Sequence, residues 1–348
     1  MTGPAFKTQF GRIFPPRQDW LAKALPEPVL EPELPIIDTH HHVWRDRGGY
    51  MLDDVMADMS GAGHNIVASV FIDCRFQYRT DGPAEMRSVG EVEAVRALAD
   101  DCLARFPGKT RVAAGIVGYA DLTLADRVEP VLAGLAQAGG GRFRGVRNSA
   151  GFHPDPVIGN NHHGATAGHY LRKDFQAGVN VLTRMGFGLD ALVFHHQHAD
   201  LLALARACPD ANIIMNHCGM PLGYGPFAGK EVEVLGEWRR HMPTIAACPN
   251  VSIKLGGMMM RLAAFDYMAA DRPPTSAELA DQWRPFIEPC IEWFGAGRCT
   301  FESNFPVDKM GIGYAGIWNA FKRLAAGASA SEKHDLFAGT ARRIYKLA

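Results

Sequence analysis

The sequence predicts a single (β/α)8 barrel of the TIM type, an α/β fold, preceded by a proline-rich arm. Short apolar runs rich in β-branched residues alternate with longer amphipathic stretches, which is typical of parallel βαβ units. There are eight such runs. No glycine-rich dinucleotide fingerprint follows the first run, and this favours a closed barrel over a doubly wound sheet.

The expected elements fill the chain from Leu34 onward. The eight strands are expected at Leu34–Asp38, Ile66–Ile72, Arg111–Val117, Phe143–Val146, Gly188–Phe194, Asn212–Asn216, Val251–Lys254 and Cys299–Glu302. Helical periodicity is found at Glu91–Phe106, Arg127–Ala138, Arg172–Met185, Leu201–Ala207, Val232–Ala246 and Ala277–Trp293. Residues 34–348 show no composition shift that would mark a second domain, so we expect one barrel there. Residues 1–33 lack a clear period and predict an arm on the surface of the barrel or of a partner subunit.

Composition narrows the class of protein. With 348 residues, 47% of them hydrophobic, the chain can bury a large core. A net charge of −1 gives no electrostatic reason to expect nucleic acid or an anionic membrane as partner. The seven cysteines include no CxxC pair, and the first 20 residues do not resemble a signal peptide. We therefore expect a cytoplasmic protein, and the arm suggests a homo-oligomer.

Histidines gather where three of the expected strands end. The segments are THHH (39–42), HHQH (195–198) and NHCG (216–219), and they hold seven of the 14 histidines. Active sites of (β/α)8 barrels lie at the carboxyl ends of the strands. The sequence therefore predicts one histidine-rich site at the barrel mouth.

The H-x-H pair suggests a metal centre. His40 and His42 should point to the same side, because strand side chains alternate with period two, whereas His41 should point away. With His195 and His217 the pair would form a set of metal ligands. Imidazole suits zinc and iron, and a bound divalent ion can generate a nucleophile from water. The expected cofactor is a divalent metal, in the first place zinc. The alternation of side chains is uncertain after the fifth strand, so His196 or His198 could point inward instead of His195.

Four further residues are predicted at the mouth. Arg147 could clamp a substrate carboxylate, with a surface salt bridge as the alternative. Lys254 could be a buried functional lysine or one that reaches the rim. Gln197 and His163, the latter in a long loop after the fourth strand, are expected substrate contacts, and His163 could equally be a solvated loop residue.

Six segments in order resemble one known group. They are IIDTHHHVW (36–44), FRGVRN (143–148), LDALVFHHQ (189–197), IIMNHCGMP (213–221), VSIKLGG (251–257) and FESNFPVD (301–308). From about Leu34 to its end the chain resembles the amidohydrolase superfamily, and within it the amidohydrolase-2 group that holds 2-pyrone-4,6-dicarboxylate lactonase-like proteins and related decarboxylases.

The resemblance implies that His40, His42, His195 and His217 occupy ligand or substrate-binding positions. It also implies that Asn304 stands where most relatives carry an aspartate that serves as general base or metal ligand. An amide cannot accept a proton at neutral pH, so Glu302, Asp308 or a histidine would have to act as base. Some lactonases of this group work without a metal, so a site without an ion, or one with iron, stays open.

The leading hypothesis is hydrolysis of a lactone or related ester of a small carboxylated compound. Its expected catalytic residues are Asn304, Glu302, Arg147 and Lys254. The alternatives are nonoxidative decarboxylation of an aromatic acid, metal-dependent oxygen chemistry, and a silent barrel that serves an active paralogue as partner subunit.

Overall fold

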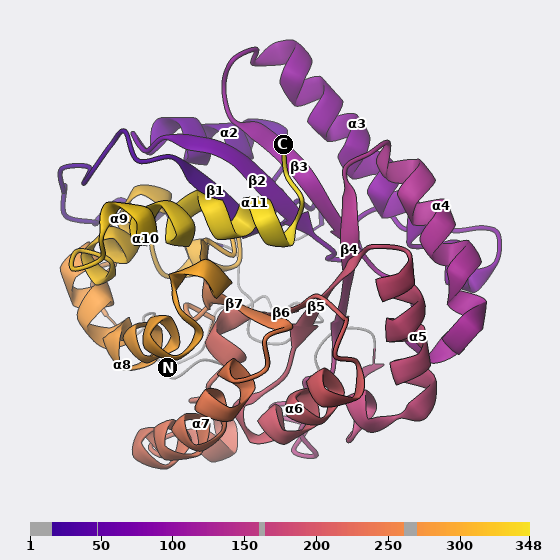
Figure 1. Cartoon of the computed structure of the whole chain (residues 1–348). Helices are drawn as coiled ribbons and strands as arrows, with labels where there is room; N and C mark the ends of the chain where they lie inside the picture. Colours follow the sequence, from indigo (N-terminus) through magenta and orange to yellow (C-terminus); the bar gives the residue numbers. More distant parts are fainter. Residues whose placement is uncertain (1–15, 47, 160–163, 261–269) are drawn as a thin grey trace.

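A computed structural model describes residues 16–46, 48–159, 164–260 and 270–348. Eight parallel strands follow one another around a single sheet in chain order, and helices cover its outside (Figure 1). This arrangement confirms the predicted (β/α)8 barrel. The strands are β1 Ile36–His41, β2 Ile66–Ile72, β3 Arg111–Gly118, β4 Phe143–Ser149, β5 Gly188–Leu192, β6 Ile213–Met215, β7 Val251–Gly256 and β8 Cys299–Glu302.

The first and last strands meet to close the barrel. The backbone amide of His42 donates to the carbonyl oxygen of Phe305 at 2.8 Å, and the Thr39 hydroxyl donates to the carbonyl oxygen of Phe301 at 2.9 Å. An isolated parallel bridge pairs His41 with Phe305. The seam between β1 and β8 therefore runs directly beside the histidines of β1.

The helices agree with the predicted ones to within a few residues where both exist. They are α1 Gln18–Leu21, α2 Leu52–Gly61, α3 Val89–Arg105, α4 Glu129–Gly139, α5 Lys173–Arg184, α6 His198–Ala207, α7 Glu231–Ala246, α8 Ser276–Phe294, α9 Tyr314–Leu324, α10 Ala330–His334 and α11 Thr340–Ile344. Helices α1, α2, α9, α10 and α11 lie outside the predicted set. No helix of the described ranges is both long and apolar enough to cross a membrane.

One end of the barrel is filled by apolar side chains. Inward residues of several strands form a small buried cluster with Tyr345, which follows α11. Its strand members are Ile37, Ala68, Val70, Ile72, Val117 and Ile214. This packing closes the interior beneath the mouth, so the functional groups lie at the carboxyl ends of the strands.

The described part of the arm packs on this chain's own barrel. The Trp20 indole donates to the carbonyl oxygen of Ala270 at 2.8 Å, and the Asn319 amide donates to that of Pro28 at 3.0 Å. Lys322 of α9 donates to the carbonyl oxygens of Leu30 and Glu31, both at 2.8 Å. A role of the arm in self-association stays a prediction.

Candidate active site

Period two on β1 sorts its three histidines. His40 and His42 point to one side, with their Nε2 atoms 3.2 Å apart. Nδ1 of His42 lies 2.8 Å from the carbonyl oxygen of Ile72, so this nitrogen donates and Nε2 keeps its lone pair. His41 points the other way, with Nε2 3.0 Å from the Ser69 hydroxyl. The expected inward pair is thus brought together.

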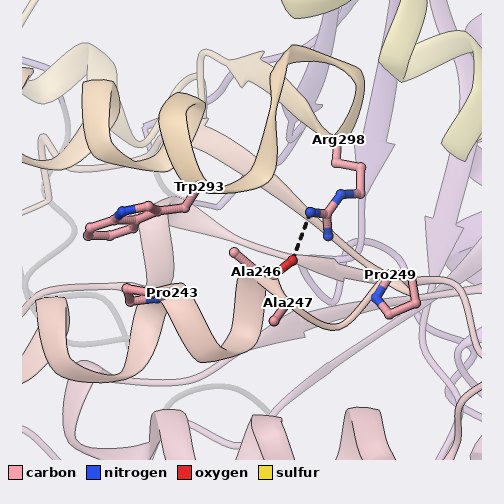
Figure 2. Close-up of a pocket in the computed structure, with 6 residues that line it drawn as sticks. All are labelled: Pro243, Ala246, Ala247, Pro249, Trp293 and Arg298. Atoms are coloured by element: carbon pink, nitrogen blue, oxygen red, sulfur yellow. Dashed lines mark hydrogen bonds between the residues drawn. The ribbon is translucent and has the colours of Figure 1, made fainter.

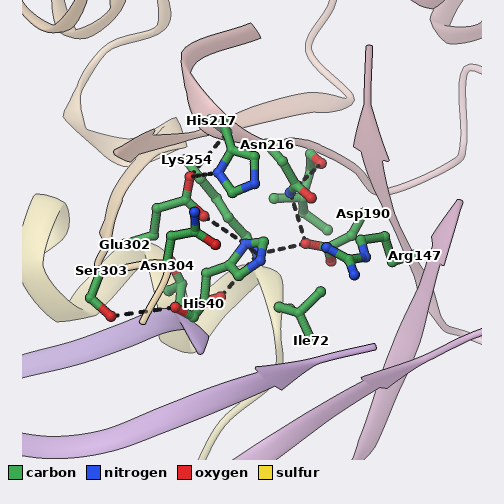
Figure 3. Close-up of polar contacts among 12 residues, drawn as sticks. His40, Ile72, Arg147, Asp190, Asn216, His217, Lys254, Glu302, Ser303 and Asn304 are labelled. Atoms are coloured by element: carbon green, nitrogen blue, oxygen red, sulfur yellow. Dashed lines mark hydrogen bonds and ion pairs between the residues drawn. The ribbon is translucent and has the colours of Figure 1, made fainter. Parts of the chain in front are cut away.

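The carboxylate of Glu302 joins His40 to the histidine of the sixth strand end. His217 donates to Oε1 of Glu302 from both Nδ1, at 2.7 Å, and its backbone amide, at 3.0 Å. Oε2 of Glu302 lies 2.7 Å from Nδ1 of His40. All three side chains are buried, and Figure 3 shows them converging from β1, β8 and the segment after β6. One acidic side chain therefore faces two imidazoles.

Two glycines allow this close approach. A Cβ on Gly257 would lie 1.9 Å from Nδ1 of His217, and one on Gly256 would lie 2.3 Å from the backbone oxygen of Glu302. His217 itself has a left-handed φ of 54°, an uncommon conformation for a residue other than glycine. The glycine pair at the end of β7 is thus the wall against which the His217–Glu302 contact is packed.

Burial keeps the inward histidines uncharged. It lowers the pKa of His40 well below the ordinary value, and the nearby Lys254 lowers it further. The pKa of His42 is lowered in the same direction, first by burial and then by Arg147. Neutral imidazoles are the form in which histidine binds metal ions.

The donor set fits a divalent ion. Ligand atoms of His40, His217 and Glu302 all lie within 4.8 Å of one another, and His42 adds a further Nε2 beside His40. Oε2 of Glu302 is buried and has no partner of regular hydrogen-bond geometry among the described residues. A buried carboxylate oxygen without such a partner is costly, and a cation would compensate it. Nitrogen and carboxylate donors suit zinc.

Asn304 follows Glu302 by two residues but turns to another carboxyl group. Its Nδ2 donates to Oδ1 of Asp308 at 2.8 Å, while the backbone amide of Met259 donates to Oδ2 at 3.2 Å. Burial raises the pKa of Asp308 well above its ordinary value. The carboxylate that faces the histidines is therefore that of Glu302, which lies two residues before Asn304.

The amidohydrolase family model matches residues 37–347, almost the whole described barrel. The chain belongs to the amidohydrolase family.

Three relatives illustrate the membership. The protein y4mH of Sinorhizobium fredii is 31% identical over 346 residues, covering 90% of this chain and 99% of that protein. An L-fucono-1,5-lactonase of Burkholderia multivorans is 27% identical over 315 residues, covering 89% and 96%. A crystal structure of a Burkholderia multivorans amidohydrolase with bound zinc has a TM-score of 0.69 at 24% identity, covering 90% and 99%, which bears on the fold.

Arg147 of this amidohydrolase lies at the rim of the cluster. Its guanidinium donates to the backbone oxygen of Asp73 and lies 3.8 Å from that residue's Oδ2. Nε of Arg147 is buried and has no hydrogen-bond partner in the described part of the chain. The side chain is 9% exposed, so the alternative of a surface salt bridge does not describe it.

The structure leaves His195 and Gln197 apart from this cluster. Nδ1 of His195 accepts from the backbone amide of Leu222 at 3.3 Å, and its Nε2 lies 3.6 Å from Oε2 of Glu237. Both ends of the Gln197 amide bind backbone, including the carbonyl oxygen of Ala150 at 2.8 Å. Their ligand and substrate-binding roles stay predictions. His163 lies outside the described residues.

Lys254 is buried, so it does not reach the rim. Its ammonium forms an ion pair with Asp190 at 2.6 Å and donates to the carbonyl oxygen of Thr39 at 2.9 Å. Asp190 was not among the predicted site residues. The signal available was a single acidic residue within the apolar run LDALVF (189–194), at a position that should face inward.

A surface hollow lies at the other end of the barrel, where β7 and β8 begin. Its lining residues are Pro243, Ala246, Ala247, Pro249, Trp293 and Arg298 (Figure 2). The guanidinium of Arg298 donates to four backbone carbonyls, among them that of Ala246 at 2.7 Å. The Arg298 guanidinium thus links the ends of helices α7 and α8 to the start of β7, at the end of the barrel opposite the histidines.

Proposed function

We propose that this amidohydrolase hydrolyses a lactone of a small carboxylated compound at the histidine cluster. The observation that carries the proposal is the Glu302 carboxylate between His40 and His217 at the barrel mouth. It supplies the acidic group that Asn304 cannot supply. The lactonase relative that matches 89% of the chain supports the reaction class.

We assign the ligand role to three imidazoles. His40, His42 and His217 would hold a divalent ion, with zinc as the first choice. When bound, the ion supplies Lewis acidity that polarises a carbonyl group. The closed apolar floor and the buried side walls keep bulk water from the cluster, which strengthens electrostatic interactions there.

Glu302 would move the proton. Its Oε1 is anchored by two donors of His217, whereas Oε2 has no regular hydrogen-bond partner in the described chain. Oε2 accepts a proton from water while the water oxygen bonds to the lactone carbonyl carbon. The ring C–O bond then breaks, and Oε2 returns the proton to the departing alkoxide, so atoms and charge balance.

Arg147 would bind the substrate carboxylate. Its guanidinium influences the pKa of both His40 and His42, which places its charge near the reacting groups. The buried Nε–H is a donor still available to a carboxylate oxygen.

The test is hydrolysis of a panel of sugar-acid lactones and carboxylated pyrones by zinc-loaded protein, followed as acid release. The matched variant is Glu302→Gln, which keeps size but removes the proton acceptor. We expect a loss of kcat of about 10²–10⁴-fold, the usual range for a general base, with zinc affinity changed far less.

Two results would contradict this proposal. An equal loss of zinc affinity in the Glu302→Gln variant would make Glu302 a ligand instead of the base. Release of CO2 from carboxylated aromatic acids, without activity on any lactone, would assign the site to the decarboxylase alternative.

A further inference from the structure

A fully buried ion pair lies beneath His40. Lys254 of β7 and Asp190 of β5 are both inaccessible to solvent, with Nζ and Oδ1 2.6 Å apart. Asp190 also accepts from the Asn216 amide at 2.9 Å and from the Tyr345 hydroxyl at 2.9 Å. The carboxylate is thus held by a residue of β7, by the residue that follows β6 and by Tyr345 at the barrel floor.

Lys254 also contacts two residues of the first strand, β1. It donates to the carbonyl oxygen of Thr39 at 2.9 Å, and its Nζ lies 3.4 Å from Nδ1 of His40. An ammonium group has three donors. Asp190 and Thr39 accept two of them, and the third lies against the His40 ring, whose Nδ1 also faces Oε2 of Glu302. Lys254 therefore holds both the backbone before His40 and the imidazole itself (Figure 3).

A contribution to folding stability does not by itself explain why the chain keeps a buried ion pair here. Desolvation of two charges offsets much of their attraction, and apolar residues of similar volume often stabilise a core equally well. The polar contacts of Lys254 give a better reason, since its ion pair ends at Asp190 and its other two polar contacts end at the first strand.

We propose that Lys254 is a positioning residue, held by Asp190, that orients the His40 imidazole for metal binding. In this role Lys254 would act through His40 and not on the substrate, whereas the sequence predicted a catalytic role for it. The inference rests on the proposed use of His40 as a ligand, and it does not depend on the substrate.

The chain contains a matched control. Lys322 of α9 is 1% exposed, and it donates to two carbonyl oxygens and lies 2.8 Å from Nδ1 of His64. It holds the arm instead of the site. Loss of either lysine removes a buried ammonium that contacts carbonyl oxygen and an imidazole, and Lys254 has a carboxylate partner in addition.

The test compares Lys254→Met/Asp190→Asn, which removes the pair without changing net charge, with Lys322→Met. Zinc affinity is measured by competition with a chelator, and the absorption spectrum of the cobalt-loaded protein reports ligand geometry. We expect the double variant to bind zinc at least about tenfold more weakly with an altered cobalt spectrum, as for other groups that orient metal ligands. Lys322→Met should keep both readouts.

Equal zinc affinities and cobalt spectra in the two variants would overturn the proposal. Should the double variant fail to fold, Asp190→Asn serves instead, because an amide oxygen can still accept from Tyr345 while the lysine loses its counter-ion. Wild-type protein that binds neither ion contradicts both this inference and the proposed function. Zinc binding without lactone hydrolysis contradicts only the proposed function.

Discussion

Two histidine groups stand at the mouth of this barrel, and they differ in what holds their rings. In the carboxylate-linked group, His40 and His217 face the carboxylate of Glu302, and His42 is fixed by a backbone carbonyl. In the aromatic group, His195 and His196 pack around the ring of Phe227 together with His153. Ring centroids of His196 and Phe227 are 5.7 Å apart and stacked.

The comparison distinguishes histidines at strand ends by the partners of their ring nitrogens. In the first group each outer nitrogen has an oxygen neighbour that orients the ring, which leaves inner nitrogens that converge. In the second group, Nδ1 of His195 accepts from a backbone amide. The partner of Nδ1 therefore separates His195 from the first group, and sequence position does not.

Removal of the inward pair should have the largest effect. We expect His40→Ala/His42→Ala to lose bound zinc and to lower kcat/KM on the order of 10³-fold, since the ion and its Lewis acidity disappear. His195→Ala should stay within about threefold of wild type. Metal analysis and lactone kinetics on the three proteins check this. An equal loss in His195→Ala would join the aromatic group to the metal set, as the sequence predicted.

Asn304→Asp should destabilise the protein at the contact beside the first group. The new carboxylate would face Asp308 across the present 2.8 Å contact, so one of the two must hold a proton or move away. We expect a loss of about 1–3 kcal/mol in the free energy of unfolding, measured with urea. The exchange Asn304→Asp/Asp308→Asn restores a donor and an acceptor and should recover most of it. A more stable single variant would contradict this reading of the contact.

The aromatic group should make stability depend on pH. Burial lowers the pKa of His195 to about 3, so the folded protein keeps it neutral while the unfolded chain protonates it below about pH 6.5. The unfolded state then binds more protons, and stability falls as pH decreases from about 6.5 toward 3. His195→Asn should reduce the slope between pH 4.5 and 6 by up to about 1.4 kcal/mol per pH unit. The exposed His334→Asn is the control, and an unchanged slope in His195→Asn would refute the assignment.

The smallest effect is expected from the stacking ring. Phe227→Leu keeps an apolar side chain but removes the aromatic contacts to three imidazoles, which should cost about 0.5–1.5 kcal/mol in unfolding free energy. Zinc affinity should not change, because the imidazoles that this ring contacts belong to the aromatic group. Thermal unfolding and chelator competition measure the two quantities. A fall in zinc affinity would show that the groups are coupled.

The fold was predictable because its signals are local. Apolar runs and helical periodicity placed all eight strands to within a few residues, and period two placed His40 and His42 on one side and His41 on the other. The strand ends were less certain, since a strand ends where its neighbour stops pairing. β6, for example, pairs only over Ile213–Met215.

The contacts within the site were harder to predict because they join distant strands. Sequence alone named Glu302 and Lys254, but not that one faces two histidines while the other is paired with Asp190. A side chain's partner depends on register across the barrel and on backbone turns such as the left-handed one at His217. The role of Gly257 likewise depends on a ring brought against it from another strand.

The seam between β1 and β8 has a consequence for how the protein is made. Thr39 and Phe301, which join across it, are separated by 262 positions in the chain. During synthesis His40 and His42 emerge early, but Glu302 reaches them only after seven other strands have been translated. A growing chain therefore cannot assemble the complete donor set, and ion capture in this form waits until the barrel closes. Occupancy of the site would thus report that folding is complete.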